Sequence, residues 1–290
     1  MIRYAISRHE LIDRIHAHRP NWIARALART GVYAQAGDYS GGTDFWGEIK
    51  QVYIELQSEK CAYCETKLQG AALASKVHEV EHFRPKASVA VWPNMSVAHW
   101  RNFVPPCAMG KASAQGYFRL AYHPFNYAIA CTRCNSTLKS NYFPIRGRRQ
   151  TSAGDPSWLY REDPLLIYPV SDLDDDPATL ITFDGVLAVP KHKAGPDWER
   201  GYTTINFFQL NHEDLTSRRA QLLAAFWYVL EVAAAGARTA RERATRHLDA
   251  ACASGGEFSG CVSAFRRLYT SNRPHAEAKA HEARVFAGLA

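Results

Sequence analysis

Two Cys-x-x-Cys pairs are the residues whose type and spacing most clearly indicate chemistry in this chain. They are Cys61–Cys64 and Cys131–Cys134. Four thiolates in two close pairs can complete a tetrahedral zinc site. In a reducing compartment such pairs are more often metal ligands than disulfides. The sequence therefore predicts a structural Zn²⁺ ion that joins two distant stretches of the chain.

A Glu-His dipeptide, Glu81–His82, lies between the two pairs, and Asn135 directly follows the second pair. Phosphodiester hydrolysis needs a base for water and a cation that neutralises charge on the phosphate. The imidazole of His82 suits the base, because it titrates near neutral pH. The oxygens of Glu81 and Asn135 are hard ligands that suit Mg²⁺ or Mn²⁺. These residue types predict a metal-dependent nuclease with a catalytic divalent ion.

The sequence around these residues predicts the elements that would position them. Val77–Phe83 reads as a strand that Pro85 ends, Tyr127–Ala130 as a second strand, and Cys131–Ser140 as a helix. Neighbouring side chains of a strand point to opposite faces. Glu81 and His82 can therefore serve one phosphate only if the strand end is twisted or if they approach it from two sides.

The rest of the chain reads as mostly helical. A capping box at Ser7 predicts a first helix, and a second is expected from about Trp22 to Gly31. Asp184-Gly185 predicts a hairpin turn, and Asn211 is the expected cap of a long C-terminal helix. We expect an α+β fold with a helical segment (1–60), a zinc and nuclease core (61–145), a mixed segment (146–204) and a helical region (205–290).

Composition limits the class of protein. The chain has 290 residues and a formal net charge of +7, with 35 Lys and Arg against 28 Asp and Glu. A basic chain favours a polyanionic partner. No run of apolar residues approaches the roughly 18 of a membrane span, and the first residues carry charge throughout. We therefore expect a cytoplasmic protein.

Three motifs resemble the HNH endonucleases, which have a ββα-metal core: VEHFRPK (80–86), FNYAIACTRCNSTLK (125–139) and NYFPI (141–145). The resemblance implies that His82 activates water, Glu81 and Asn135 bind the catalytic metal, and Asn126 is the middle Asn that orients the loop. Zinc-bearing members of the family have Cys pairs at matching places. This sequence has Glu where Asp is common, and Asn where a final His often stands. Asn102 has the same spacing to Cys107 as Asn126 has to Cys131, so the middle Asn has two candidates.

CAYCE (61–65), the DDDP turn (174–177) and TTINFFQLNHEDLTSRR (203–219) extend the resemblance over roughly residues 50 to 235. They look like the HNH nucleases of bacterial anti-phage systems, including the nuclease subunit of Septu systems and the effectors of some retrons. That resemblance implies a role in antiviral defence and an ATPase partner subunit.

Several basic residues are candidates for binding the nucleic-acid backbone: Lys86, Lys139, Arg146, Arg148 and Arg149. For each lysine a solvated side chain is an equally good interpretation. The Arg238–Arg246 stretch reads as a solvated helix face. Residue types do not distinguish DNA from RNA as the substrate.

Two other functions fit parts of the sequence. A zinc-stabilised subunit could bind nucleic acid or a partner without cutting it, because structural zinc is common in binding modules. HEVEH (78–82) also matches H-E-x-x-H, the zinc-protease signature, which requires a helix to bring both histidines to one face. Pro85 and the valines favour a strand instead, so His78 and Glu79 are expected to be ordinary exposed residues.

Overall fold

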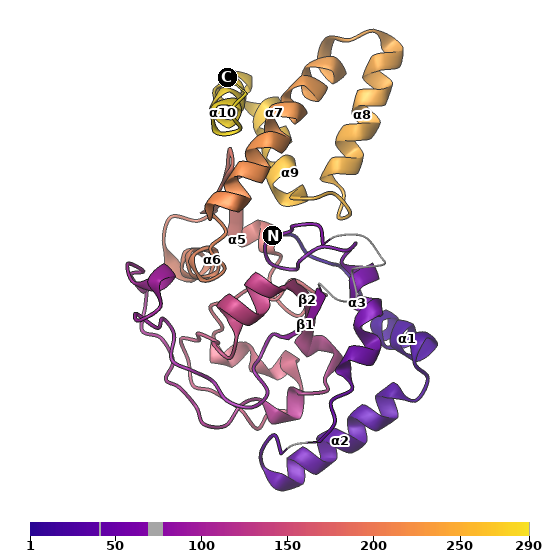
Figure 1. The fold of residues 1–290 in the computed structure, drawn as a ribbon, viewed down its shortest axis with the longest axis vertical. Coiled ribbons are helices and arrows are strands. Elements are labelled where there is room, and N and C mark those ends of the chain that lie inside the picture. The colour runs from indigo at the N-terminus through magenta and orange to yellow at the C-terminus, as the bar shows by residue number, and fades with distance from the viewer. Residues whose placement is uncertain (41, 69–77, 290) are drawn as a thin grey trace.

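The computed structural model describes residues 1–40, 42–68 and 78–289. The fold is α+β, as expected, with many helices and two small two-stranded sheets. In Figure 1 the sheet β1–β2 lies inside the larger, lower part of the molecule. Helices α7–α10 form a separate projection at the opposite end from α2. The residues with candidate chemistry therefore lie in the larger part.

The N-terminal helices are α1 (Arg8–His18), α2 (Trp22–Ala36), the 3₁₀ turn η1 (Trp46–Ile49) and α3 (Lys50–Leu56). Of these helices, α3 contacts strand β2 of the central sheet, and α1 packs against α2 and α3. The expected cap of α1 is present, since Ser7 Oγ accepts a hydrogen bond from Glu10 N. The expected end of α2 at Gly31 is wrong. The helix continues to Gly37, whose φ of 76° provides the left-handed cap.

The central unit is two antiparallel strands followed by a short helix. Its elements are β1 (His78–His82), β2 (Tyr127–Cys131) and the π-helix η5 (Arg133–Lys139). The register pairs Glu81 with Ala128 and His82 with Tyr127. All three elements agree with the predicted strand, strand and helix, although Val77 lies outside the described residues. The long connection contains three 3₁₀ turns, η2 (Ala98–Trp100), η3 (Phe118–Leu120) and η4 (Pro124–Asn126).

A second small sheet and several helices follow the central unit. They are η6 (Pro156–Glu162), α5 (Pro177–Leu180), β3 (Ile181–Asp184), β4 (Leu187–Pro190) and α6 (Gly195–Phe207). Strands β3 and β4 form the predicted hairpin. Gly185 has a φ of 57°, a conformation that glycine adopts without strain. This hairpin contacts α6 and α9, so it connects the larger part to the helical projection.

The C-terminal projection contains α7 (Glu213–Ala235), α8 (Arg238–Cys252), α9 (Ser259–Ser271) and α10 (Arg273–Phe286). The expected cap of α7 by Asn211 is wrong. His212 is the cap, and Asn211 instead bonds the backbone of Ala188 in β4 through both its amide atoms. Throughout the described ranges, no helix combines the length and the apolar character needed to cross a membrane.

Candidate active site and metal centre

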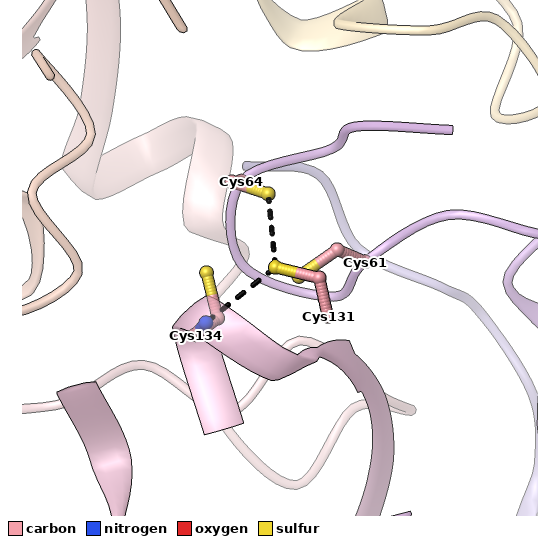
Figure 2. A group of neighbouring side chains, drawn as sticks. All are labelled: Cys61, Cys64, Cys131 and Cys134. Atoms are coloured by element: carbon pink, nitrogen blue, oxygen red, sulfur yellow. Dashed lines mark hydrogen bonds between the residues drawn. The ribbon is translucent and has the colours of Figure 1, made fainter. Parts of the chain in front are cut away.

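The four predicted zinc ligands meet in one cluster. The sulfur atoms of Cys61, Cys64, Cys131 and Cys134 all lie within 4.8 Å of one another, and Cys64 Sγ is 3.9 Å from Cys131 Sγ. Figure 2 shows the four side chains converging from two segments of the chain. A Zn–S bond of about 2.3 Å places the sulfurs of a tetrahedral site about 3.8 Å apart. The cluster therefore has the ligand types and spacing to hold one zinc ion.

A tight turn supplies the first cysteine pair. Cys61 N donates to Thr66 O at 3.0 Å and Glu65 N donates to Cys61 O at 3.1 Å, and Glu65 adopts a φ of 61° to close the turn. Ala62 N also donates to Ile129 O in β2 at 2.9 Å. Cys131 ends β2 and Cys134 lies in the first turn of η5. The turn and the central unit are thus aligned by backbone contacts as well as by the sulfurs.

His82 lies at the end of β1 in an aromatic environment. Its ring makes edge contacts with Trp46 and Tyr127, at centroid distances of 4.8 and 5.0 Å. Its Nε2 lies 3.1 Å from Ala121 O. Since a carbonyl oxygen can only accept a hydrogen bond, Nε2 carries the proton and donates it to this bond. In the neutral ring Nδ1 then keeps its lone pair. Burial, aided by the Lys86 charge, holds the pKa of His82 well below its usual value, which favours this neutral form.

Glu81 is a buried carboxylate on the opposite face of β1 from His82. Its side chain is 2% exposed, and Lys139 Nζ lies 3.2 Å from Oε1 as an ion pair without the alignment of a hydrogen bond. Burial raises the pKa of the Glu81 carboxyl to about 7, although Lys139 opposes this rise. One oxygen of a buried carboxylate therefore lacks a hydrogen bond from any of the described residues.

Lys139, a predicted contact for the nucleic-acid backbone, does not reach the solvent in this structure. Lys139 is fully buried, where it pairs with Glu81 and donates to His82 O at 3.4 Å. On the helical spacing it does share a side with Asn135, as expected, but this side faces β1 and not the solvent. Lys139 therefore joins η5 to the strand that carries the candidate base.

Asn126 is fully buried, and its side chain hydrogen-bonds the backbone of two segments, at Arg84 and at Leu120. Its Oδ1 accepts from Arg84 N at 2.8 Å. Its Nδ2 donates to Arg84 O at 3.0 Å and to Leu120 O at 3.1 Å. Asn102, the alternative candidate, is an exposed residue of a turn. The structure thus brings Asn126, and not Asn102, beside the segment that follows His82.

Asn135 is held by a residue that the sequence analysis missed. Its Nδ2 donates to Glu79 Oε2 at 2.7 Å. Glu79 is half-buried, which corrects the expectation of an ordinary exposed residue. Because Glu79 is two residues from Glu81 on the same strand, both point to the face that η5 covers. This two-residue spacing was the signal in the sequence that could have identified it.

An open pocket of about 200 Å³ lies at the end of β1, and its lining residues include Glu81, His82, Lys86 and Asn135. Although Glu81 and His82 point to opposite faces of the strand, both residues border this pocket. Carboxylate and amide oxygens are suitable donors for a hard divalent cation. The residue types of Glu81 and Asn135 thus fit the predicted metal site, although Glu81 Oε1 is ion-paired with Lys139 in this structure.

The remaining basic candidates have different environments. Lys86 borders the pocket and lies 4.5 Å from the Trp46 ring centre. Arg146 forms ion pairs with Asp163 and Glu199, so its charge is already neutralised within the protein. Arg149 Nε donates to Lys111 O at 2.9 Å, whereas Arg148 is exposed. Among these candidates, Arg148 is thus exposed and Lys86 borders the pocket, whereas Arg146 is paired within the protein.

The zinc-protease interpretation disagrees with the backbone. HEVEH forms strand β1 and not a helix. Residues four apart on a strand are separated by roughly 13 Å, so residues 78 and 82 lie too far apart to share one zinc ion. Among the described residues, the four cysteines are the one group of Cys, His, Asp or Glu side chains close enough together to hold a metal ion.

The chain is similar to curated proteins named Septu protein PtuB. One from Bacillus mycoides is 28% identical over 176 residues, which cover 60% of this chain and 50% of that protein. Another from Bacillus thuringiensis is 37% identical over 95 residues, covering 32% of this chain and 34% of that protein. The chain thus spans half or less of the length of these relatives. No family model and no solved structure matches it.

Proposed function

We propose that this relative of the Septu PtuB proteins is a metal-dependent endonuclease of the HNH type that hydrolyses DNA phosphodiester bonds. The observation that carries the proposal is the pocket at the end of β1, which gathers His82, Glu81 and Asn135. The order of strand, strand and helix, with four cysteines that can hold zinc, supports the ββα-metal assignment.

The chain's own residues support a division of roles in this reaction. His82 Nδ1 carries the lone pair that can take a proton from water, while Ala121 O fixes the ring through Nε2. Glu81 and Asn135 would hold one Mg²⁺ or Mn²⁺ ion. Such an ion, when bound, stabilises negative charge on the phosphate and on the departing 3′ oxygen. Asn126 fixes the backbone of Arg84, two residues after the base.

The names of the relatives support a biological context. We propose that the nuclease is the effector of a bacterial anti-phage defence system and acts with an ATPase partner subunit. The partner rests on the resemblance to Septu systems. In this proposal the zinc ion is structural, and the divalent ion at Glu81 and Asn135 is the catalytic one.

A plasmid-nicking assay tests the proposal. Wild type and His82→Ala are compared in Mg²⁺, Mn²⁺ or EDTA, and zinc is measured on the same samples. We expect metal-dependent cleavage that the variant loses, with about one zinc per chain retained in both. Cleavage by the variant at the wild-type rate would refute the role of His82 as base.

The same assay separates nuclease from binding module. If neither protein cleaves, it is repeated with the product of the neighbouring gene. Cleavage that appears only with this partner supports a nuclease that the partner activates. DNA binding without cleavage, unaffected by His82→Ala and by divalent ions, would instead identify a zinc-stabilised binding subunit. Replacing the plasmid with RNA tests the other substrate class.

A further inference from the structure

We propose that Glu79 is a positioning residue of this site and fixes the side-chain amide of Asn135 so that its oxygen faces the metal pocket. The inference rests on the proposed function and adds to it a residue outside the predicted set. Glu79 lies in the middle of β1, and Asn135 lies in η5, the helix that covers this face of the strand.

Glu79 accepts hydrogen bonds from three side chains at the start of η5. Thr132 Oγ1 donates to Oε1 at 2.9 Å, and Asn135 Nδ2 and Ser136 Oγ each donate to Oε2 at 2.7 Å. Lys139, at the other end of η5, pairs with Glu81. The two carboxylates of β1 therefore hold the two ends of one short helix. Their spacing along the strand sets the position of Asn135 between them.

The chemistry of the carboxylate determines which atom of Asn135 faces it. An ionised carboxylate has no proton to donate, so only the NH₂ group of the amide can satisfy Glu79. The amide oxygen, on the other branch of the same group, is thereby directed away from Glu79. Asn135 borders the pocket beside Glu81 and His82. Without Glu79 the amide could rotate and present its NH₂ group to the pocket, where it would repel a cation.

This arrangement matches the way that proteins usually orient metal ligands. Side chains that hydrogen-bond a ligand fix its orientation, and their loss typically reduces metal affinity by about 10- to 100-fold. Both oxygens of Glu79 accept hydrogen bonds, whereas Glu81 Oε1 accepts none and has the ion pair with Lys139. The structure thus assigns Glu79 to orientation and Glu81 to the ion.

Mn²⁺ binding to the zinc-loaded full chain tests this role without relying on cleavage. Glu79→Gln keeps the size of the side chain but replaces one acceptor oxygen with a donor. We expect it to weaken Mn²⁺ binding about 10- to 100-fold, with zinc content unchanged. Ser136→Ala is the matched control, because it removes a bond to the same oxygen and leaves the Asn135 amide in place. An affinity of Glu79→Gln equal to that of wild type, or an equal loss in Ser136→Ala, would overturn the role.

A double substitution distinguishes orientation from general loss of structure. Combining Glu79→Gln with Asn135→Asp reverses the polarity of the bond, since the new amide can donate to the new carboxylate. We expect the double variant to bind Mn²⁺ more tightly than either single variant. If it is as weak as Glu79→Gln, the orientation argument is wrong. Failure of the proposed function would give a different result. In that case wild type would bind no Mn²⁺, or Glu81→Ala would bind Mn²⁺ as tightly as wild type does.

Discussion

Asn126 shows how one side chain can hold the backbone around a reactive residue. Its three hydrogen bonds satisfy Arg84 N, Arg84 O and Leu120 O, and the side chain is fully buried. Asn126→Ala leaves these groups without partners, and each unsatisfied buried group costs about 1–3 kcal/mol. We expect the melting temperature, measured by circular dichroism, to fall by roughly 5–10 °C.

Asn102 provides the control for this prediction. It has the same side chain and the same spacing to a cysteine, but it is exposed. Surface substitutions of this kind usually change stability by less than about 0.5 kcal/mol. Equal melting temperatures for Asn126→Ala and Asn102→Ala would contradict the structural role of Asn126.

Glu81 and Lys139 show why residue type was easier to predict than residue environment. The motif identified both residues as part of the site, but a lysine near a nuclease centre reads equally well as a phosphate contact. Its burial depends on packing against β1, which comes from a distant part of the sequence. The two-residue spacing from Glu81 indicated the face of β1 on which Glu79 lies, but not its partners. Its three donors lie on η5, and only the folded structure brings them together.

Loss of a cysteine ligand from the turn that carries Cys61 and Cys64 should destabilise the whole larger part of the molecule. Metal-binding energy is folding energy where the site exists only in the folded chain. Cys61→Ser should therefore lose zinc and lower the melting temperature strongly. Cys107→Ser is the control, because Cys107 is free and lies outside the cluster. Zinc content and melting temperature are measured on the same samples. If both values for Cys61→Ser equal those of wild type, the zinc ion has no structural role.

Local signals predicted those elements whose ends are determined by local chemistry. Ser7 begins α1 by accepting from Glu10 N, and Gly185 turns the hairpin with a positive φ. Signals failed where tertiary contacts decide the outcome. Gly31 lies inside α2 because a helix tolerates one glycine, and Gly37 provides the left-handed end. Asn211 resembled a helix cap, but its amide pairs with Ala188 in the neighbouring strand.

At the scale of the molecule, the four-cysteine cluster is joined through neighbouring residues to both the pocket at the end of β1 and the helical projection. On one side, Cys134 and Asn135 are neighbours in η5. On the other, Glu65 follows Cys64 and accepts from Ser259 Oγ and Gly260 N, each at 3.0 Å, at the start of α9. The turn that carries Cys61 and Cys64 thus links the central unit to the C-terminal helices, which Figure 1 shows as a separate projection.

The positions of the basic side chains make the proposed contact with DNA testable. Lys86 borders the pocket and Arg148 is exposed. Arg241 belongs to α8, and Figure 1 shows this helix in the projection, away from β1. A cation that neutralises one phosphate contributes about one unit to the slope of log affinity against log salt. We expect Lys86→Gln and Arg148→Gln each to lower that slope by about one and Arg241→Gln to leave it unchanged. Fluorescence anisotropy with labelled DNA, in EDTA to prevent cleavage, measures the slope. A reduced slope in Arg241→Gln alone would move the DNA contact from the pocket to the helical projection.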